Sequence, residues 1–531
     1  MEEFGRSGFL STEQVDRPIT FYNIQELFQL AEEEGKRYID ENNKYERIDE
    51  FTAAKYQNII GVVGAAGIGK TTLAKTMLDL ALNLTQNERE YVFYLPLRSI
   101  DFGRKMNVLE FLMKYTLPSW KHSNDKDMEY LDEILNAHLT YIIIDGLDEV
   151  DLNKLRKRSS DVSLFDYTFP DQILKNLLSG HLLPNAKKLI TSRPAAFHEI
   201  DPLYKPLFVV KLLGLGESSQ LLLIEQLCSK SEYSKVKNHF ETHPGLSRFC
   251  FNPMHCIMLI RYIQKTHHHQ NIASSVSEVF AATFDDCIRS VHFKHKPENL
   301  SLLTELALRG VKENRFIFTY ADVTEGWEVV EVFLKLKIIT KKDFHVKILD
   351  GDKRFFFAHL QWQEFFASVH LMFVESLEGF QQLLPQLSEP RWHSVTQFLF
   401  GFYRSKVEDV MSVMFSTYSK TDFEAKKLLL LNTIPSKLPL GTLKKQDKFF
   451  TVCAWAFEAY NVNVTQQVYR SFPQSLHLMQ HITPSDIAAL SFILFRVEKP
   501  IAINLDYGMF HGHALSQFLH VTRQTSHQVS V

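Results

Sequence analysis

The stretch that decides the fold is GAAGIGKTT, residues 64–72, which fits the pattern G-x-x-x-x-G-K-S/T in full. An apolar run, IIGVV (59–63), precedes it, and a helix-forming segment, TTLAKTMLDLAL (71–82), follows it. Glycines let the backbone curl so that successive N–H groups point at phosphates, and the helix start adds a favourable potential. Lys70 can then reach the outer phosphates of a nucleotide, and the Thr71 hydroxyl can bind Mg²⁺. The predicted phosphate-binding loop consists of Gly64, Ala65, Ala66, Gly67, Ile68, Gly69, Lys70, Thr71 and Thr72.

A second motif, YIIIDGLDE (141–149), is an apolar strand that ends in an aspartate. Such a strand carries Asp145 to the edge of a parallel sheet beside the phosphate-binding loop, where it is expected to hold Mg²⁺, partly through water. Asp148 and Glu149 lie just beyond the strand and are candidate catalytic groups, because a carboxylate beside a metal can polarise an attacking water. Acidic residues after a strand are also explained by a solvated turn, and the phosphate-binding loop upstream favours the catalytic interpretation.

A third motif, LITSRP (189–194), ends another strand at the same edge and presents Arg193. A guanidinium group can neutralise the charge of a γ-phosphate and report whether that phosphate is present. The competing interpretation is an arginine on an exposed turn. Together with Asp148 and Glu149, Arg193 completes the predicted catalytic set.

Five apolar runs are predicted to be buried strands of one sheet, because they are continuous in Val, Ile and Leu rather than alternating. They are residues 58–64, 91–97, 141–147, 187–192 and 208–214. Segments long enough for helices separate them, which indicates right-handed βαβ units and a parallel sheet. After about residue 216 the strands are predicted to stop, apart from a short β-wing in 337–360, and amphipathic helices continue over 376–480.

The composition narrows the class of protein. Lys and Arg number 59 against 62 Asp and Glu, a formal net charge of −3, which does not favour binding to nucleic acid. The five cysteines are few and irregularly spaced, as expected in a reducing compartment. The first residues are charged and lack the apolar core of a signal peptide. No apolar run approaches the ~18 residues needed to cross a bilayer. We therefore expect a cytoplasmic protein without a membrane segment.

The three motifs, in this order, resemble the NACHT module of animal NLR (NOD-like receptor) proteins, which are STAND-class P-loop NTPases. The strings GAAGIGKTT, IIIDGLDEV and LLPNAKKLITSRPAAF carry the resemblance, and VFYLPLRSID is similar to the strand after the family's first helix. Further along, FNPMHCIMLI resembles the family's proline-bearing helical segment, and FFFAHLQWQEFFAS resembles its winged-helix signature. The resemblance covers roughly residues 55–480.

The resemblance implies a fold class: an α/β P-loop NTPase domain with a parallel sheet, followed by helical, winged-helix and second helical domains. The first segment is short and polar, has a helix over 23–45, and contains no recognised death-fold or other effector domain. The expected order is segment 1–54, NACHT nucleotide-binding domain 55–215, helical domain 216–280, winged-helix domain 281–375, second helical domain 376–483, and a stub of leucine-rich repeats over 484–531.

The resemblance also implies ligands and residue roles. Pro253 would lie against the adenine of ATP or ADP, and His359 would contact the β-phosphate of ADP and hold a closed state. The chain would then be a slow, Mg²⁺-dependent ATPase that is closed with ADP and open with ATP. It would control self-association, or co-assembly with related NLR proteins, in inflammasome-like innate immune signalling. The preference for ATP over GTP follows from the resemblance alone.

Other functions stay open at this point. The chain could be a non-signalling regulator or decoy that binds nucleotide and co-assembles with longer NLR proteins, although the intact motifs mildly favour a working switch. A metabolic P-loop kinase is disfavoured by the long helical tail and by the lack of an acceptor-substrate motif. A transporter ATPase of the ABC type is disfavoured by the lack of a membrane segment.

Overall fold

The computed structural model divides the chain into two compact units, residues 1–214 with 344–348 (unit 1) and residues 215–343 with 349–531 (unit 2). The structure describes residues 10–12, 18–19, 24–42, 58–84, 90–116, 129, 135, 139–158, 160–212, 214–242, 250–265, 275–290, 297–323, 330, 334, 339–342, 354–415, 417–438, 440, 443–482, 484–497, 500–510, 514–523 and 528–530.

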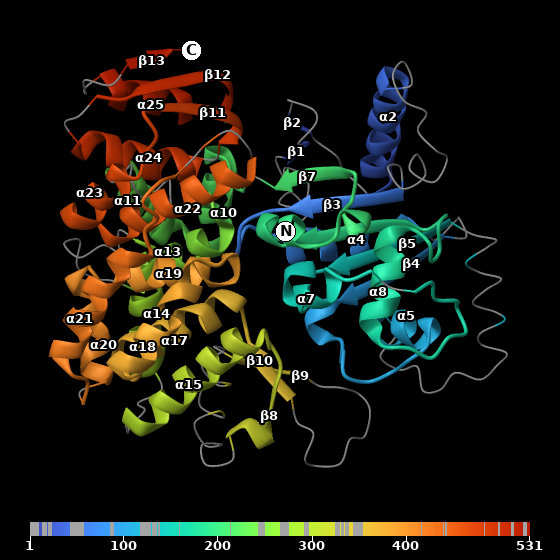
Figure 1. Cartoon of the computed structure of the whole chain (residues 1–531), viewed down its shortest axis with the longest axis horizontal. Helices are drawn as coiled ribbons and strands as arrows, with labels where there is room; N and C mark the ends of the chain where they lie inside the picture. The colour runs from blue at the N-terminus through green and yellow to red at the C-terminus, as the bar shows by residue number, and fades with distance from the viewer. Residues whose placement is uncertain are drawn as a thin grey trace. The chain divides into compact units, whose positions relative to one another are not determined.

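Unit 1 is built on a seven-stranded sheet in the order β2-β1-β7-β3-β6-β5-β4 (Figure 1). Five of its strands run parallel and confirm the five predicted ones. They are β3 (Ile59–Val63), β4 (Glu90–Pro96), β5 (Leu139–Asp145), β6 (Lys187–Ser192) and β7 (Phe208–Leu212). Because β6 lies between β3 and β5, this order brings the ends of three motif-bearing strands next to one another.

Helices cover both faces of the parallel sheet, which explains why its strands are apolar throughout. Ile60 and Val62 pack in one core with α2 (Ile24–Asn42) and α4 (Lys70–Leu84). Ile59 and Val63 pack in a second core with α5 (Val108–Thr116) and α8 (Pro170–Ser179). Alternate residues of β3 therefore enter different cores, and this holds the strand that leads into the phosphate-binding loop.

The described residues of the N-terminal segment pack against the sheet of unit 1. The predicted helix over 23–45 is present as α2, and its Phe28 ring is fully buried, 5.8 Å from the ring of Tyr141. The short strand β1 (Leu10–Thr12) pairs antiparallel with β7, and β2 (Pro18–Ile19) pairs with β1. The sequence did not predict these two strands, because runs this short give no periodic signal.

Unit 2 is mostly helical, as predicted. Its longer helices are α10 (Glu217–Leu227), α11 (Lys230–Thr242), α13 (Pro253–Lys265), α14 (Val276–Ser290), α15 (Pro297–Glu313), α17 (Leu360–Phe373), α19 (His393–Gly401), α20 (Ser405–Met414), α21 (Lys420–Leu430), α22 (Leu443–Ala459), α23 (Val462–Arg470), α24 (Pro484–Arg496) and α25 (Ala514–Arg523). Among the described residues, no helix is both long and apolar enough to cross a membrane.

A small antiparallel sheet in unit 2 contains the predicted β-wing. Its order is β8 (Phe318–Thr319), β10 (Arg354–Phe357), β9 (Ile339–Lys342), and the last two strands lie inside the predicted range 337–360. The assignment of the surrounding residues to a winged-helix domain, and the domain limits in general, remain predictions.

Aromatic rings form the core that joins α14, α17 and α19. The Phe280 ring on α14 lies 4.7 Å from Trp362 and 5.5 Å from Phe365, both on α17, and 5.1 Å from Phe398 on α19. Such tilted and edge-on aromatic pairs stabilise a core beyond their buried area. The start of α17, which carries the predicted nucleotide residue His359, is therefore fixed by packing within unit 2.

The C-terminal part of unit 2 corrects the prediction that strands stop and helices continue to residue 480. A parallel sheet of β11 (Ser475–Ile482), β12 (Ala502–Phe510) and β13 (Gln528–Ser530) alternates with α24 and α25. The physical reason lies in the alternation of β11, where Leu476 and Leu478 are buried between more polar neighbours. Ser475 pairs with Ala502, and Ala502 pairs with Gln528, so the structural period is 27 and then 26 residues.

Candidate functional site

The phosphate-binding loop joins β3 to α4, as predicted. Gly67 and Gly69 have φ values of 77° and 104°, which side chains rarely adopt. A Cβ on Gly64 would lie 2.7 Å from the Ile68 side chain, so the loop needs a glycine there as well. The Gly64 N–H donates to the Ser192 carbonyl at 3.1 Å, which ties the loop to the end of β6. These features form the curled backbone that a phosphate cradle requires.

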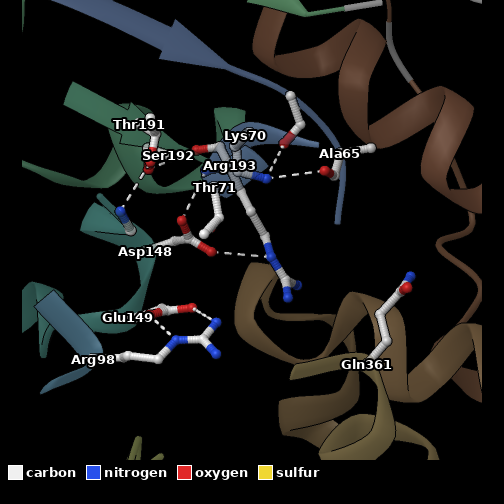
Figure 2. Close-up of polar contacts among 12 residues, drawn as sticks. Ala65, Lys70, Thr71, Arg98, Asp148, Glu149, Thr191, Ser192, Arg193 and Gln361 are labelled. Atoms are coloured by element: carbon white, nitrogen blue, oxygen red, sulfur yellow. Dashed lines mark hydrogen bonds and ion pairs between the residues drawn. The ribbon is translucent and has the colours of Figure 1, made fainter. Parts of the chain in front are cut away.

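Lys70 lies folded back over this loop. Its ammonium group donates to the carbonyl oxygens of Gly64 at 2.8 Å and Ala65 at 2.9 Å (Figure 2). Burial lowers the pKa of Lys70, and the nearby Asp148 carboxylate opposes that shift. The cation therefore already lies in the mouth of the loop, where a phosphate group would offer stronger acceptors than the two carbonyls.

Asp145 lies at the end of β5, next to the start of α4. The Thr71 hydroxyl donates to its Oδ1 at 3.3 Å, and the Thr191 hydroxyl donates to the same oxygen at 2.6 Å. The Tyr94 hydroxyl donates to Oδ2 at 3.0 Å. A carboxylate and a hydroxyl placed together in this way fit the oxygen ligands that Mg²⁺ prefers. The role of Thr71 and Asp145 in binding the metal stays a prediction.

Asp148 is engaged with the third motif. Its Oδ1 accepts a hydrogen bond from the Arg193 backbone N–H at 3.0 Å, and its Oδ2 forms an ion pair with Arg193 Nε at 3.0 Å (Figure 2). The two residues come from neighbouring strand ends, after β5 and after β6. The structure thus brings these two predicted catalytic residues together, in an arrangement where Asp148 orients Arg193.

Glu149 is held by an arginine that the sequence did not single out. Arg98, just after β4, donates through Nε to Glu149 Oε2 at 3.0 Å and through Nη2 to Oε1 at 2.6 Å. Burial raises the pKa of Glu149, although the Arg98 guanidinium acts in the opposite direction. Such two-point pairing fixes both oxygens of the carboxylate.

Three residues that contact the predicted site residues Asp145 and Glu149 were missing from the predicted set: Tyr94, Arg98 and Thr191. All three lie inside two strings of the predicted sheet, VFYLPLRSID and LITSRP. The residue types carried a signal, since a tyrosine and a threonine within apolar strands, and an arginine directly after one, need polar partners when they are buried. Their partners, Asp145 and Glu149, could not be predicted, because the sequence does not show that β4 and β6 lie on either side of β5.

Pro253 and His359 both lie in unit 2, each at the start of a helix. Pro253 is the first residue of α13, and Asn252 caps that helix by accepting from Met254 N–H at 3.1 Å. His359 caps α17, and its Nδ1 accepts from Gln361 N–H at 3.2 Å. A neutral ring that accepts at Nδ1 carries its proton on Nε2.

The strand–loop–helix unit with Lys70 and Thr71, joined at one sheet edge by Asp145, defines a P-loop nucleotide-binding domain. Residues 58–231 match the family model of the NACHT domain. Residues 58–231 are therefore identified as a NACHT domain, and the chain is similar to proteins of the NLR type.

Curated relatives agree with this assignment. The chain is 26% identical over 406 residues to the human "NACHT, LRR and PYD domains-containing protein 13", an alignment that covers 71% of this chain and 37% of that protein. It is 24% identical over 339 residues to protein 3 of the same series from Bos taurus, with 61% and 31% covered. The chain therefore spans about a third of the length of these relatives.

Among solved structures, a STAND protein with a tetratricopeptide repeat sensor from Pyrococcus horikoshii aligns with 88% of this chain and 68% of its own. The identity is 14% and the TM-score is 0.25. The family assignment rests on the sequence matches and on the phosphate-binding loop.

Proposed function

We propose that this chain is an ATP-binding molecular switch that hydrolyses ATP slowly and controls self-assembly in NLR-type innate immune signalling. The observation that carries the proposal is the meeting of Lys70, Thr71 and Asp145 at one edge of the sheet. On this proposal the loop and Lys70 bind the phosphates, and Thr71 and Asp145 hold Mg²⁺. The metal would neutralise phosphate charge when bound.

Arg193, Asp148 and Glu149, at the same edge of the sheet, would lie near the γ-phosphate and take part in its hydrolysis. Arg193 would contact the γ-phosphate, and Asp148 would set the direction of its guanidinium. Glu149 would orient the attacking water and accept its proton, for which a raised pKa is suited. Arg98 would limit the rate, because Glu149 has to exchange one of its two hydrogen bonds for the water.

We propose that unit 2 supplies the sensor for ADP. Pro253 would lie against adenine, and the Nε2–H group of His359 would donate to the β-phosphate. Moving a two-state population from roughly 1:99 to 99:1 needs about 5.5 kcal/mol of differential binding. A hydrogen bond to a charged group contributes about 1.5–3 kcal/mol. His359 would therefore be one contribution among several, with domain packing providing the rest.

We also propose that the C-terminal α/β part opens a leucine-rich repeat array. Its strands are parallel, helices alternate with them, and the periods of 27 and 26 residues fall within the range of that repeat class. On this proposal the array begins at β11, ahead of the predicted limit of 484.

The switch is tested by sedimentation velocity and limited proteolysis in Mg-ADP and in Mg-ATPγS, a slowly hydrolysed analogue. We expect a compact, protease-resistant monomer with ADP, and a protease-sensitive or assembling species with the analogue. If both nucleotides bind but give the same sedimentation and the same cleavage pattern, the chain binds nucleotide without switching.

A further inference from the structure

Tyr94 lies on β4, in register with Ile143 of the neighbouring strand β5. Ile143 is two residues before Asp145, so the side chains of Ile143 and Asp145 are on the same face of the sheet. Tyr94 is therefore the diagonal neighbour of Asp145 on that face, a separation that an aromatic side chain can cross. The geometry confirms the reach: Tyr94 Oη donates to Asp145 Oδ2 at 3.0 Å.

The two oxygens of Asp145 have different surroundings. Oδ1 accepts from Thr71, the predicted metal-binding hydroxyl, at 3.3 Å and from Thr191 at 2.6 Å. Oδ2 accepts from Tyr94. The terminal torsion of an aspartate is broad and roughly two-fold, so the carboxylate does not fix its own plane. Donors on both oxygens fix it, and Tyr94 supplies the donor on the Oδ2 side.

Tyr94 remains a donor under ordinary conditions. A tyrosine hydroxyl carries its proton at neutral pH, so it can donate to the carboxylate. The ring also packs against the core that contains α2 and α4. Replacement of Tyr94 by phenylalanine would keep this packing and remove only the hydroxyl.

We propose that Tyr94 is a positioning residue for the nucleotide-bound Mg²⁺: its hydroxyl holds Asp145 so that Oδ1 faces the Thr71 side of the site. This inference rests on the proposed nucleotide binding. Tyr94 acts through Asp145 and does not touch the nucleotide itself. Groups that hydrogen-bond to a metal ligand without contacting the metal typically contribute roughly 10- to 100-fold to metal affinity.

The test is the affinity of the full chain for fluorescent ADP, measured once in excess Mg²⁺ and once in EDTA. For Tyr94→Phe we expect the ratio of the two affinities to fall about 10-fold, with the affinity in EDTA unchanged. Tyr91→Phe, on the same strand, is the matched control and should keep the wild-type ratio. The ratio separates a metal effect from a general loss of binding, which would lower both affinities.

A second variant pair tests whether Tyr94 acts through Asp145. Asp145→Asn should lower the same ratio, and adding Tyr94→Phe to it should produce little further change. The inference is overturned if Tyr94→Phe keeps the wild-type ratio, if it weakens binding equally in EDTA, or if the wild-type ratio is one. Failure of the wild-type chain to bind ADP under either condition would instead overturn the proposed function.

Discussion

The sheet edge in unit 1 and two helix starts in unit 2 both contain predicted nucleotide residues, but these residues are held in place in different ways. At the sheet edge, a nine-residue motif sets its own backbone geometry, and the register of adjacent strands brings Asp145, Asp148 and Arg193 beside it. In unit 2, Pro253 and His359 depend on helix caps and on an aromatic core drawn from distant parts of the chain. On the proposed function, short motifs would specify nucleotide binding, whereas packing between distant segments would specify switching.

The largest effect is expected from a charged residue inside the unit 1 sheet. Lys188 is fully buried on β6, and its ammonium group donates to the Leu183 carbonyl at 2.6 Å. Burial lowers its pKa from 10.5 to about 7. Below about pH 7 the lysine is protonated in both the folded and the unfolded chain. The folded state is then destabilised by the full cost of burying the charged ammonium group. Lys188→Met should raise the free energy of unfolding at neutral pH by up to about 4 kcal/mol.

The difference in stability between Lys188→Met and wild type should depend on pH. The folded pKa of Lys188 is depressed, so wild-type stability recovers as pH rises from about 7 towards 10.5. The gap between Lys188→Met and wild type should accordingly narrow over that range in urea unfolding followed by tryptophan fluorescence. A gap that stays constant with pH would mean that Lys188 is not titrating inside the sheet.

The second prediction tests whether the phosphate-binding loop specifies nucleotide binding. Lys70→Ala removes the cation that lies in the mouth of the loop, and ADP affinity should fall about 100-fold, the value of one strong charged hydrogen-bonding contact. Lys75→Ala, an exposed lysine on the same helix, is the control. Isothermal titration calorimetry measures both. Equal affinities for the two variants would show that the loop does not hold phosphate.

The next prediction concerns the Arg98–Glu149 ion pair, which forms because β4 lies beside β5 in the sheet. Arg98→Gln leaves the mostly buried Glu149 carboxylate without its two-point partner, and the chain should lose about 1–3 kcal/mol of stability. Adding Glu149→Gln should restore part of that loss, because the uncompensated charge is then gone. Urea unfolding of the single and double variants checks this. Simple addition of the two losses would indicate that the pair is not coupled energetically.

The smallest effect concerns unit 2. His359→Ala should speed ADP release about 10-fold while ADP association stays unchanged. Because His359 also caps α17, His359→Asn is the informative partner: asparagine keeps a cap acceptor but lacks the ring N–H. Stopped-flow release of fluorescent ADP should then be fast for both variants. Slow, wild-type release from His359→Asn would assign His359 a capping role only.

The same contrast explains how much the sequence could predict. The five parallel strands, the loop and its helix follow from apolar runs and a glycine pattern, which are local signals. The contacts of Tyr94, Arg98 and Thr191 depend on which strands become neighbours, and that order is decided by packing. Lys188 shows the same limit, since nothing in KKLITS tells which lysine is buried.

In unit 2 the sequence predicted helices well but missed β11. The alternation in SLHLMQHI was present, but most of this segment was assigned to the helices predicted over 376–480. Its partner β12 lies 27 residues further along, beyond α24, so the pairing was not a local signal. The roles of Pro253 and His359 came from family resemblance, and the structure adds the helix caps at the two positions.

The most direct test of the account is to purify the chain without added nucleotide, denature it, and identify what is released by chromatography. The account predicts ADP in roughly one-to-one amount with wild-type protein, and its loss from Lys70→Ala. Release of no nucleotide, together with no thermal stabilisation by added Mg-ATP, would contradict the claim that the carboxyl edge of this sheet is a working nucleotide site.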